Sequence, residues 1–214
     1  NNYEWINLNY DLWSMDSLQD VHSNTYTFNK LQSNDAGRYK VKVTNPNLPK
    51  LTLESKTISI KVCDLKKDSL ELVKLYNSTN GSSWHNKTNW LKPIQKISNW
   101  HGVYTTKEGC VRSIILDNNN LNGNIPSLEL NTLDTLILSN NQLEGNIPEL
   151  NTPFIKYINL RNNVLQGNFP NKLKNWTDLS GIDLGKNILQ GPIPSIFGDL
   201  NNLQELKLDN NQFT

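Results

Sequence analysis

Five segments in the second half of this 214-residue chain repeat one aliphatic pattern, and this repeat constrains the fold more than any other feature. They begin at intervals of 22, 22, 24 and 24 residues, at Val111, Leu133, Ile155, Leu179 and Leu203. The shared pattern is L-x-x-L-x-L-x-x-N-x-L-x-G-x-I-P, with Ile, Val or Phe replacing some leucines. Such a period is the signature of a solenoid, in which each repeat buries its apolar residues only by stacking on its neighbours.

The L-x-L core of each repeat predicts a short strand whose alternate residues, such as Ile114 and Leu116, point into the core. The Asn at the ninth position comes where the strand ends and the chain turns. Its amide can pair backbone groups that the turn leaves without partners, and each buried unpaired group would cost about 1–3 kcal/mol. We therefore expect a structural asparagine ladder made of Asn119, Asn141, Asn163, Asn187 and Asn211.

These motifs resemble the leucine-rich repeat family in its plant-type form, with the L-x-G-x-I-P extension, over residues 64–214. Residues 63–110 look like the N-terminal cap of plant-type repeats and of related bacterial surface proteins. Within them we expect a helix with Asp68 as its N-cap and Asn80-Gly81 as its end. Trp84, Trp90 and Trp100 follow the helix, and we expect them to plug the first repeat; the alternative is a platform on which a sugar stacks.

The cap departs from the plant pattern at its cysteines. Ser98 and Thr105 stand where the plant cap has its two Cys, so that bridge is absent. The two cysteines of the chain are Cys63, before the expected helix, and Cys110, at the first repeat. A Cys63–Cys110 disulfide would clamp the cap and imply an oxidising compartment; two buried free thiols are the alternative.

Residues 1–62 do not follow the repeat. Alternating residues predict strands over 24–31, 38–45 and 51–62, with turns at 34–37 and 45–49. The string D-A-G-R-Y at 35–39 resembles the corner of immunoglobulin-like domains, in which the Tyr39 hydroxyl bonds to the backbone just upstream. Trp5 stands where the core Trp of the third strand belongs, and Val41 replaces the usual Cys. This resemblance implies a β-sandwich whose first two strands precede residue 1.

The expected fold class is thus β-rich with two domains: an immunoglobulin-like β-sandwich over 1–62, then a repeat solenoid with an α-helical N-terminal cap. The cap spans 63–110 and five repeats span 111–214. Because the fifth repeat stops before its Gly and Pro, we expect further repeats or domains of the same chain beyond Thr214.

Composition and motifs argue against several classes of function. The formal net charge is +1, which gives no electrostatic footprint for nucleic acid or an anionic membrane. No apolar run is long enough for membrane insertion. His22, His85 and His101 form no metal-spaced cluster, and no nucleophile elbow, P-loop or zinc-protease motif occurs. We therefore predict no enzyme, no catalytic residues, no metal and no cofactor in this segment.

The remaining candidate is the outward face of the strands, which solenoids present as an extended concave binding surface. Neighbouring apolar residues, an aromatic ring and an arginine suit a protein-binding hot spot; β-branched residues that merely favour strands are the alternative. The candidate ligand-binding residues are Ile115, Ile137, Tyr157, Asn159, Arg161 and Asp183.

We expect an extracellular, secreted or cell-surface adhesion module that binds a protein or a glycan on a cell surface. One alternative is a stalk or component of a larger surface assembly. Another is the accessory region of an enzyme whose catalytic domain lies elsewhere. Sequons at Asn77, Asn80, Asn86 and Asn175 would carry glycans only in a eukaryotic secretory protein.

Overall fold

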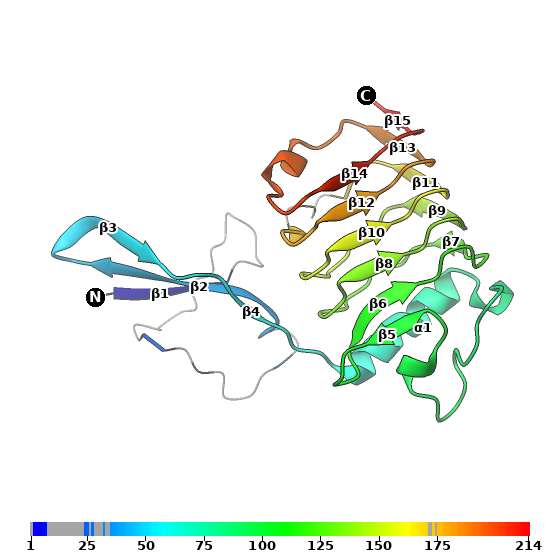
Figure 1. The fold of residues 1–214 in the computed structure, drawn as a ribbon, viewed down its shortest axis with the longest axis horizontal. Helices are drawn as coiled ribbons and strands as arrows, with labels where there is room; N and C mark the ends of the chain where they lie inside the picture. Colours follow the sequence, from blue (N-terminus) through cyan, green and yellow to red (C-terminus); the bar gives the residue numbers. More distant parts are fainter. Residues whose placement is uncertain are drawn as a thin grey trace. The chain divides into compact units, whose positions relative to one another are not determined.

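The structure is a computed structural model that describes residues 2–7, 24, 25, 27, 32, 35–170, 173 and 175–214. The chain divides into two compact units, Asn1–Val62 and Cys63–Thr214. His22, Asn34 and most of the strand expected over 24–31 lie outside the described residues. Figure 1 shows the strands of each unit along the chain.

The first unit contains one antiparallel sheet among its described residues. β2 (Gly37–Asn45) pairs with β1 (Asn2–Asn7), β3 (Leu48–Glu54) and β4 (Ile58–Ile60). The single strand expected over 51–62 is thus two strands with a break between them. The β2–β3 hairpin turns at Pro46 and Asn47, where Pro fixes φ and Asn tolerates tight turns. No second sheet is present in the described part of this unit, so a sandwich is not seen there.

Two contacts in the first unit involve residues on which the resemblance to immunoglobulin-like domains rests. The Tyr39 hydroxyl donates to the backbone carbonyl of Asp35 at 2.9 Å, and Tyr39 is buried. Trp5 lies directly opposite Val41 in the β1–β2 ladder and is half-buried.

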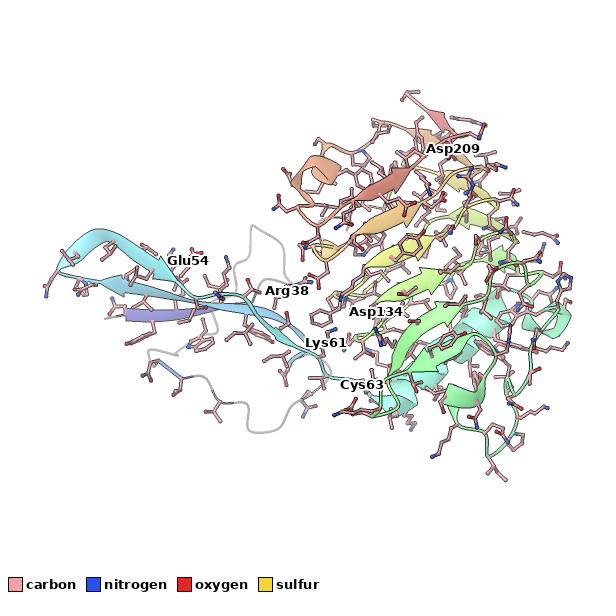
Figure 2. The ribbon with its side chains drawn as sticks, in the orientation of Figure 1. Arg38, Glu54, Lys61, Cys63, Asp134 and Asp209 are labelled. Atoms are coloured by element: carbon pink, nitrogen blue, oxygen red, sulfur yellow. A yellow bond between two sulfur atoms is a disulfide. The ribbon has the colours of Figure 1, made fainter. Side chains whose placement is uncertain are left out.

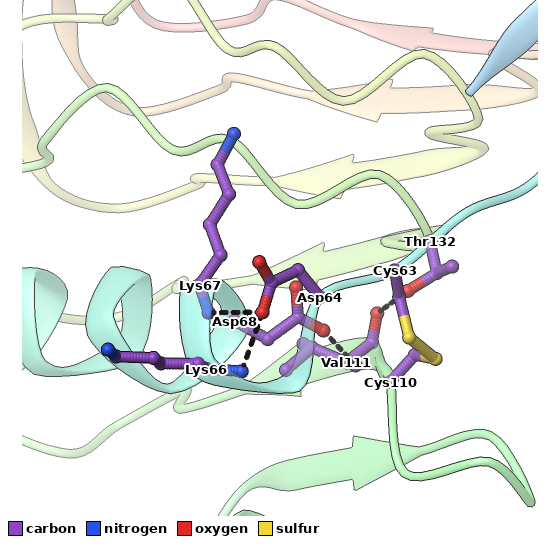
Figure 3. The surroundings of a disulfide bond; sticks show 8 residues. All are labelled: Cys63, Asp64, Lys66, Lys67, Asp68, Cys110, Val111 and Thr132. Atoms are coloured by element: carbon purple, nitrogen blue, oxygen red, sulfur yellow. Dashed lines mark hydrogen bonds between the residues drawn. A yellow bond between two sulfur atoms is a disulfide. The ribbon is translucent and has the colours of Figure 1, made fainter. Parts of the chain in front are cut away.

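The second unit begins with α1 (Leu65–Ser78), the one α-helix of the described residues. Its N-cap is Asp64, whose carboxylate accepts from the backbone N–H groups of Lys66 and Lys67 at 2.9 and 3.1 Å. The expectation that Asp68 caps the helix is therefore wrong. Asp68 lies inside the first turn, where it is buried and accepts from the backbone N–H of Val111 at 2.7 Å (Figure 3).

The helix packs on the first repeat through Leu72 and Leu75, both fully buried. Two 3₁₀ turns, η2 (Gly81–Ser83) and η3 (Ile97–Asn99), directly precede Trp84 and Trp100. Trp84, Trp90 and Trp100 are each at most 7% exposed, with ring centroids 4.8–4.9 Å apart along the row. They belong to the core that continues into the repeats. No indole face is left open for a sugar to stack on. The burial of the three tryptophans therefore agrees with the expected plug of the first repeat and not with a sugar-binding platform.

The rest of the second unit is a β-rich solenoid of stacked coils (Figure 1). Its first sheet has the order β14-β12-β10-β8-β6-β5, parallel except for the antiparallel β5. These strands are β5 (Val103–Thr105), β6 (Val111–Ile115), β8 (Thr135–Ile137), β10 (Tyr157–Asn159), β12 (Gly181–Asp183) and β14 (Glu205–Lys207).

A second, parallel sheet has the order β15-β13-β11-β9-β7. Its strands are β7 (Asn122–Asn124), β9 (Gln142–Asn146), β11 (Val164–Gly167), β13 (Ile188–Gly191) and β15 (Gln212–Phe213). A 3₁₀ turn, η5 (Ser195–Asp199), follows β13. The aliphatic rows lie between the sheets as the pattern predicts: Ile114, Leu136, Ile158 and Ile182 are at most 1% exposed. In the last coil, Leu206 is 39% exposed.

The ninth-position asparagines form a ladder that joins each coil to the one before it. Asn163 Nδ2 donates to the carbonyls of Leu138 and Leu160 at 3.0 Å, and its Oδ1 accepts from the N–H of Leu143 at 2.9 Å. The same exchange recurs at the other repeats, at Asn141, Asn187 and Asn211. Asn119 instead exchanges both hydrogen bonds with the backbone of Asn86 and so ties the first coil to the segment before it.

A disulfide joins Cys63 to Cys110 across a sequence separation of 47 residues. It lies beside the Asp68–Val111 hydrogen bond, and the Val111 carbonyl in turn accepts from the Thr132 hydroxyl at 2.7 Å (Figure 3). The start of α1 is thus fixed to the first strand of the solenoid by both a covalent bond and a buried polar contact.

Replacing Asn163 with Ala should lower the free energy of unfolding by about 3 kcal/mol, because three buried backbone groups lose their partner. The measurement is urea unfolding followed by circular dichroism. Gln166→Ala is the matched control: this exposed amide makes no hydrogen bond among the described residues, so its effect should stay within about 0.5 kcal/mol. Equal effects at the two positions would contradict a structural role for the ladder.

Removing the disulfide with Cys63→Ala/Cys110→Ala should lower the free energy of unfolding by about 2–4 kcal/mol, since a loop of this length no longer restricts the unfolded chain. The measurement is the same urea titration, with the oxidised protein as reference. A loss well below about 1 kcal/mol would show that the bond does not constrain the unfolded state.

Candidate functional site

The outward positions of the first sheet line up in register across the coils. Ile115, Ile137, Asn159, Asp183 and Lys207 are successive ladder partners on β6, β8, β10, β12 and β14. The parallel register therefore places four of the six candidate residues in one row. The other two, Tyr157 and Arg161, lie two residues to either side of Asn159, at the start of β10 and just after its end.

The row is apolar at its β6 end. Ile115 and Ile137 are neighbours and both are half-buried, with the rest of each side chain open to solvent. Tyr104 on β5 is 55% exposed and pairs with Ser113, which lies in the next column of the same face. The sequence columns miss Tyr104 because β5 precedes the repeats and runs antiparallel to them.

The β14 end of the face is charged and internally paired. Arg161 forms two hydrogen bonds to Asp209, Nη1–Oδ1 at 2.8 Å and Nη2–Oδ2 at 2.7 Å, and Nη1 also reaches Asp183 Oδ1 at 3.2 Å. The Arg161 side chain is 28% exposed and that of Asp183 is 6% exposed. We call Arg161, Asp183 and Asp209 the charged triad; Asp209 follows β14 (Figure 2).

Two glycines of the fourth repeat, which contains β12, make room for this arrangement. A Cβ at Gly185 would collide with Arg161 Nη1 and Asp209 Oδ1, and one at Gly181 would collide with the Tyr157 ring. The guanidinium and the phenol ring therefore each lie across a position without a side chain. This holds both groups against the sheet and limits the conformational entropy that they would lose on binding.

The charged triad shifts the pKa values of its members. The hydrogen bonds from Arg161 lower the pKa of Asp209 to about 2, and those bonds raise the pKa of Arg161. Burial raises the pKa of Tyr157, and the nearby carboxylates of Glu205 and Asp183 raise it further. Tyr157 thus stays neutral, and the face presents a phenol at the start of β10 and a fixed guanidinium just after its end.

Besides Tyr104, three residues of this site were not among the candidates: Asp209, Glu205 and Lys207. They occupy the same repeat positions as Arg161, Tyr157 and Asn159, so the repeat register was the signal that could have found them. Lys207 pairs with Glu205 on the same strand. Sequence columns could not show that Arg161 reaches across the β12 coil to an Asp 48 residues further along the chain.

Within the described part of the chain, no group of three or more His, Cys, Asp or Glu side chains is arranged to hold a metal ion. The described helices are all too short or too polar to cross a lipid bilayer.

Comparisons with known proteins agree on the solenoid. The family model described as Leucine Rich Repeat matches residues 132–151. A chain in the crystal structure of the BIR3–SERK2 complex from Arabidopsis thaliana is 30% identical, with a TM-score of 0.59, over 69% of this chain and 83% of that chain. The BIR2 ectodomain from Arabidopsis thaliana is 29% identical, with a TM-score of 0.62, over 69% and 81%.

Pollen Receptor Kinase 3 is 31% identical, with a TM-score of 0.57, over 66% of this chain and 71% of that chain. No curated protein matches the sequence. These similar structures are plant receptor ectodomains, and they lend no support to the expected bacterial type or to an immunoglobulin-like first unit.

The Asp209 carboxyl should titrate near pH 2 by NMR. In Arg161→Gln, its pKa should return toward the ordinary value of about 3.9. Because the folded-state pKa lies below the unfolded one, the stabilisation from this pair is fully present above about pH 4 and is lost as pH falls through the folded pKa. An unchanged Asp209 pKa in the variant would show that Arg161 does not hold this carboxylate.

Proposed function

The chain belongs to the leucine-rich repeat family, and from that premise we propose that it is an extracellular module that binds a protein ligand on its first sheet, without catalysis. The observation that carries the proposal is the division of this face into an apolar end and a charged end. Ile115 and Ile137 offer apolar surface, and Tyr157 and the charged triad offer polar groups already held in place. A surface of this kind gains specificity from its fixed polar groups and binding energy from its apolar ones.

The comparisons support a protein partner more than any other class. One similar solved structure is a complex of two named proteins, BIR3 and SERK2, and another is described as an ectodomain. The disulfide fits the extracellular location, since disulfides persist in oxidising compartments. A role in adhesion is a narrower form of the same proposal.

We also propose that Arg161 acts through the charged triad and not as a free cation. Its guanidinium already makes three hydrogen bonds to carboxylates, so a ligand would meet the outer oxygens of Asp209 and the exposed part of the guanidinium. With Glu205 and Lys207 beside it, this end of the face carries three carboxylates against two cations. A partner with a basic group would therefore be favoured there.

Residues 63–110 are proposed to cap the solenoid. Leu72, Leu75 and the three tryptophans cover the apolar end of the first coil, which would otherwise meet water. The Asn119–Asn86 exchange and the Cys63–Cys110 disulfide fasten this segment to the coil.

For residues 1–62 we propose an immunoglobulin-like module that serves as a spacer. The supporting observations are the antiparallel order β1-β2-β3, the Tyr39–Asp35 hydrogen bond at the corner and the placement of Trp5 opposite Val41.

The test uses the whole chain to probe an array of purified extracellular domains, and then measures the affinity of the strongest partner by biolayer interferometry. Ile115→Asp/Ile137→Asp should weaken that affinity by at least about tenfold, because two charges replace the apolar contact surface. Circular dichroism of each variant checks that the fold is retained.

The matched control is Val164→Asp/Ile188→Asp, which makes the same change at two exposed residues of the second sheet. It should leave the affinity for the protein partner unchanged. Equal losses in the two variants, or a loss only in the control, would contradict the assignment of the first sheet as the protein-binding face.

A further inference from the structure

The second sheet carries a hollow that the protein-binding proposal does not use. Its volume is about 330 Å³, and it is lined by Asn146, Gln166, Gly167, Ile188, Gln190 and Gln212. We call these residues the amide hollow. They come from four successive strands, β9, β11, β13 and β15, which stack side by side in Figure 1.

The amides of the hollow are open to solvent and unpaired. Asn146, Gln166, Gln190 and Gln212 are all exposed. Among the described residues, none of these four side chains makes a hydrogen bond. Each therefore keeps two N–H donors and a carbonyl acceptor for a ligand. By contrast, Gln142, on the same face but outside the hollow, already donates to Asn120 at 2.7 Å.

The hollow has no charge and one apolar contact. None of its six lining residues is ionisable; Glu144, on the same strand as Asn146, is not among them. An ionised ligand would lose hydration there without gaining an opposite charge. Ile188 is 44% exposed and offers an aliphatic surface beside the amides. Hydroxyl groups both donate and accept, so a ring with hydroxyls on its edge and C–H groups on its face matches this mixture.

The sheet also imposes a spacing. Asn146, Gln166 and Ile188 are ladder partners on three successive strands, and Gln190 and Gln212 are partners on the next pair. Neighbouring strands lie about 4.8 Å apart, so the lining groups repeat at that interval along the stack. An extended chain of β-linked hexoses advances by a similar distance with each ring and would present one ring to each coil.

Glycines allow the lining residues of neighbouring coils to stay in register. A Cβ at Gly167 would collide with Asn146 Oδ1, and one at Gly191 would collide with Asn168 Oδ1. Both glycines have positive φ, which side-chain-bearing residues rarely adopt. Consecutive coils can therefore lie in register under an extended ligand.

We propose that the amide hollow is a binding site for an extended, neutral, β-linked oligosaccharide that runs across the strands, separate from the protein-binding face. The site would bind through shared hydrogen bonds and one aliphatic contact, with no metal and no charge.

The test is isothermal titration calorimetry of the whole chain with three probes: cellohexaose, maltohexaose and hexagalacturonate. Cellohexaose should bind with a Kd of about 1 mM or below. Maltohexaose has the same composition but a curved chain, and hexagalacturonate is anionic; both should bind more weakly. Undetectable binding of cellohexaose, equal affinity for maltohexaose, or preference for hexagalacturonate would each overturn the proposal.

The variant Gln166→Ala/Gln190→Ala should weaken cellohexaose binding by about tenfold, because the ligand loses hydrogen bonds to two side chains. The control Gln142→Ala/Glu144→Ala changes two exposed residues of β9 outside the hollow and should leave the Kd unchanged. Ile115→Asp/Ile137→Asp should also leave it unchanged, which separates this site from the protein-binding face. Wild-type affinity in the Gln166/Gln190 variant would overturn the assignment of the site.

Discussion

The pairing of buried backbone groups by asparagine amides is the constraint on which the solenoid depends. Each coil turns sharply after a short strand, and this turn leaves carbonyls and N–H groups inside the core. Asn163 pairs with groups from its own coil and from the coil before it, so one side chain closes the turn and fixes the spacing to its neighbour. Because a buried unpaired group costs more than one hydrogen bond gains, an aliphatic residue could not replace it.

With the backbone and the aliphatic rows satisfied inside, the outward residues are free to differ between coils. The two sheets use that freedom differently. The first places Ile115 and Ile137 at one end and the charged triad at the other, whereas the second gathers unpaired amides around Ile188. The stacking of the coils sets the spacing of residues on both surfaces. Residues far apart in the sequence therefore lie side by side on each sheet.

Arg161 shows that the strand register decides which partners a side chain has. The sequence columns place it near apolar residues and an aromatic ring, a combination that suits a protein-binding hot spot. In the structure it crosses Gly185 to reach Asp209, and the resulting hydrogen bonds lower the pKa of that carboxyl. Asp68 changes in the same way: its position suggests a helix cap, but the helix begins earlier, at Asp64, and leaves Asp68 buried against Val111.

The sequence by itself determined the solenoid, the buried rows and the columns of outward residues, because a pattern that recurs about every 23 residues is the signature of stacked repeats that bury a continuous core. It also singled out Tyr39 as a residue whose hydroxyl bonds to the backbone upstream, and the two cysteines as a candidate disulfide. Only the tertiary structure decided the contacts that skip a coil, such as Arg161–Asp209, and the place of Tyr104 beside the first repeat. Such contacts depend on side-chain reach and on space left by glycines of an intervening coil, and no local pattern in the sequence carries that information.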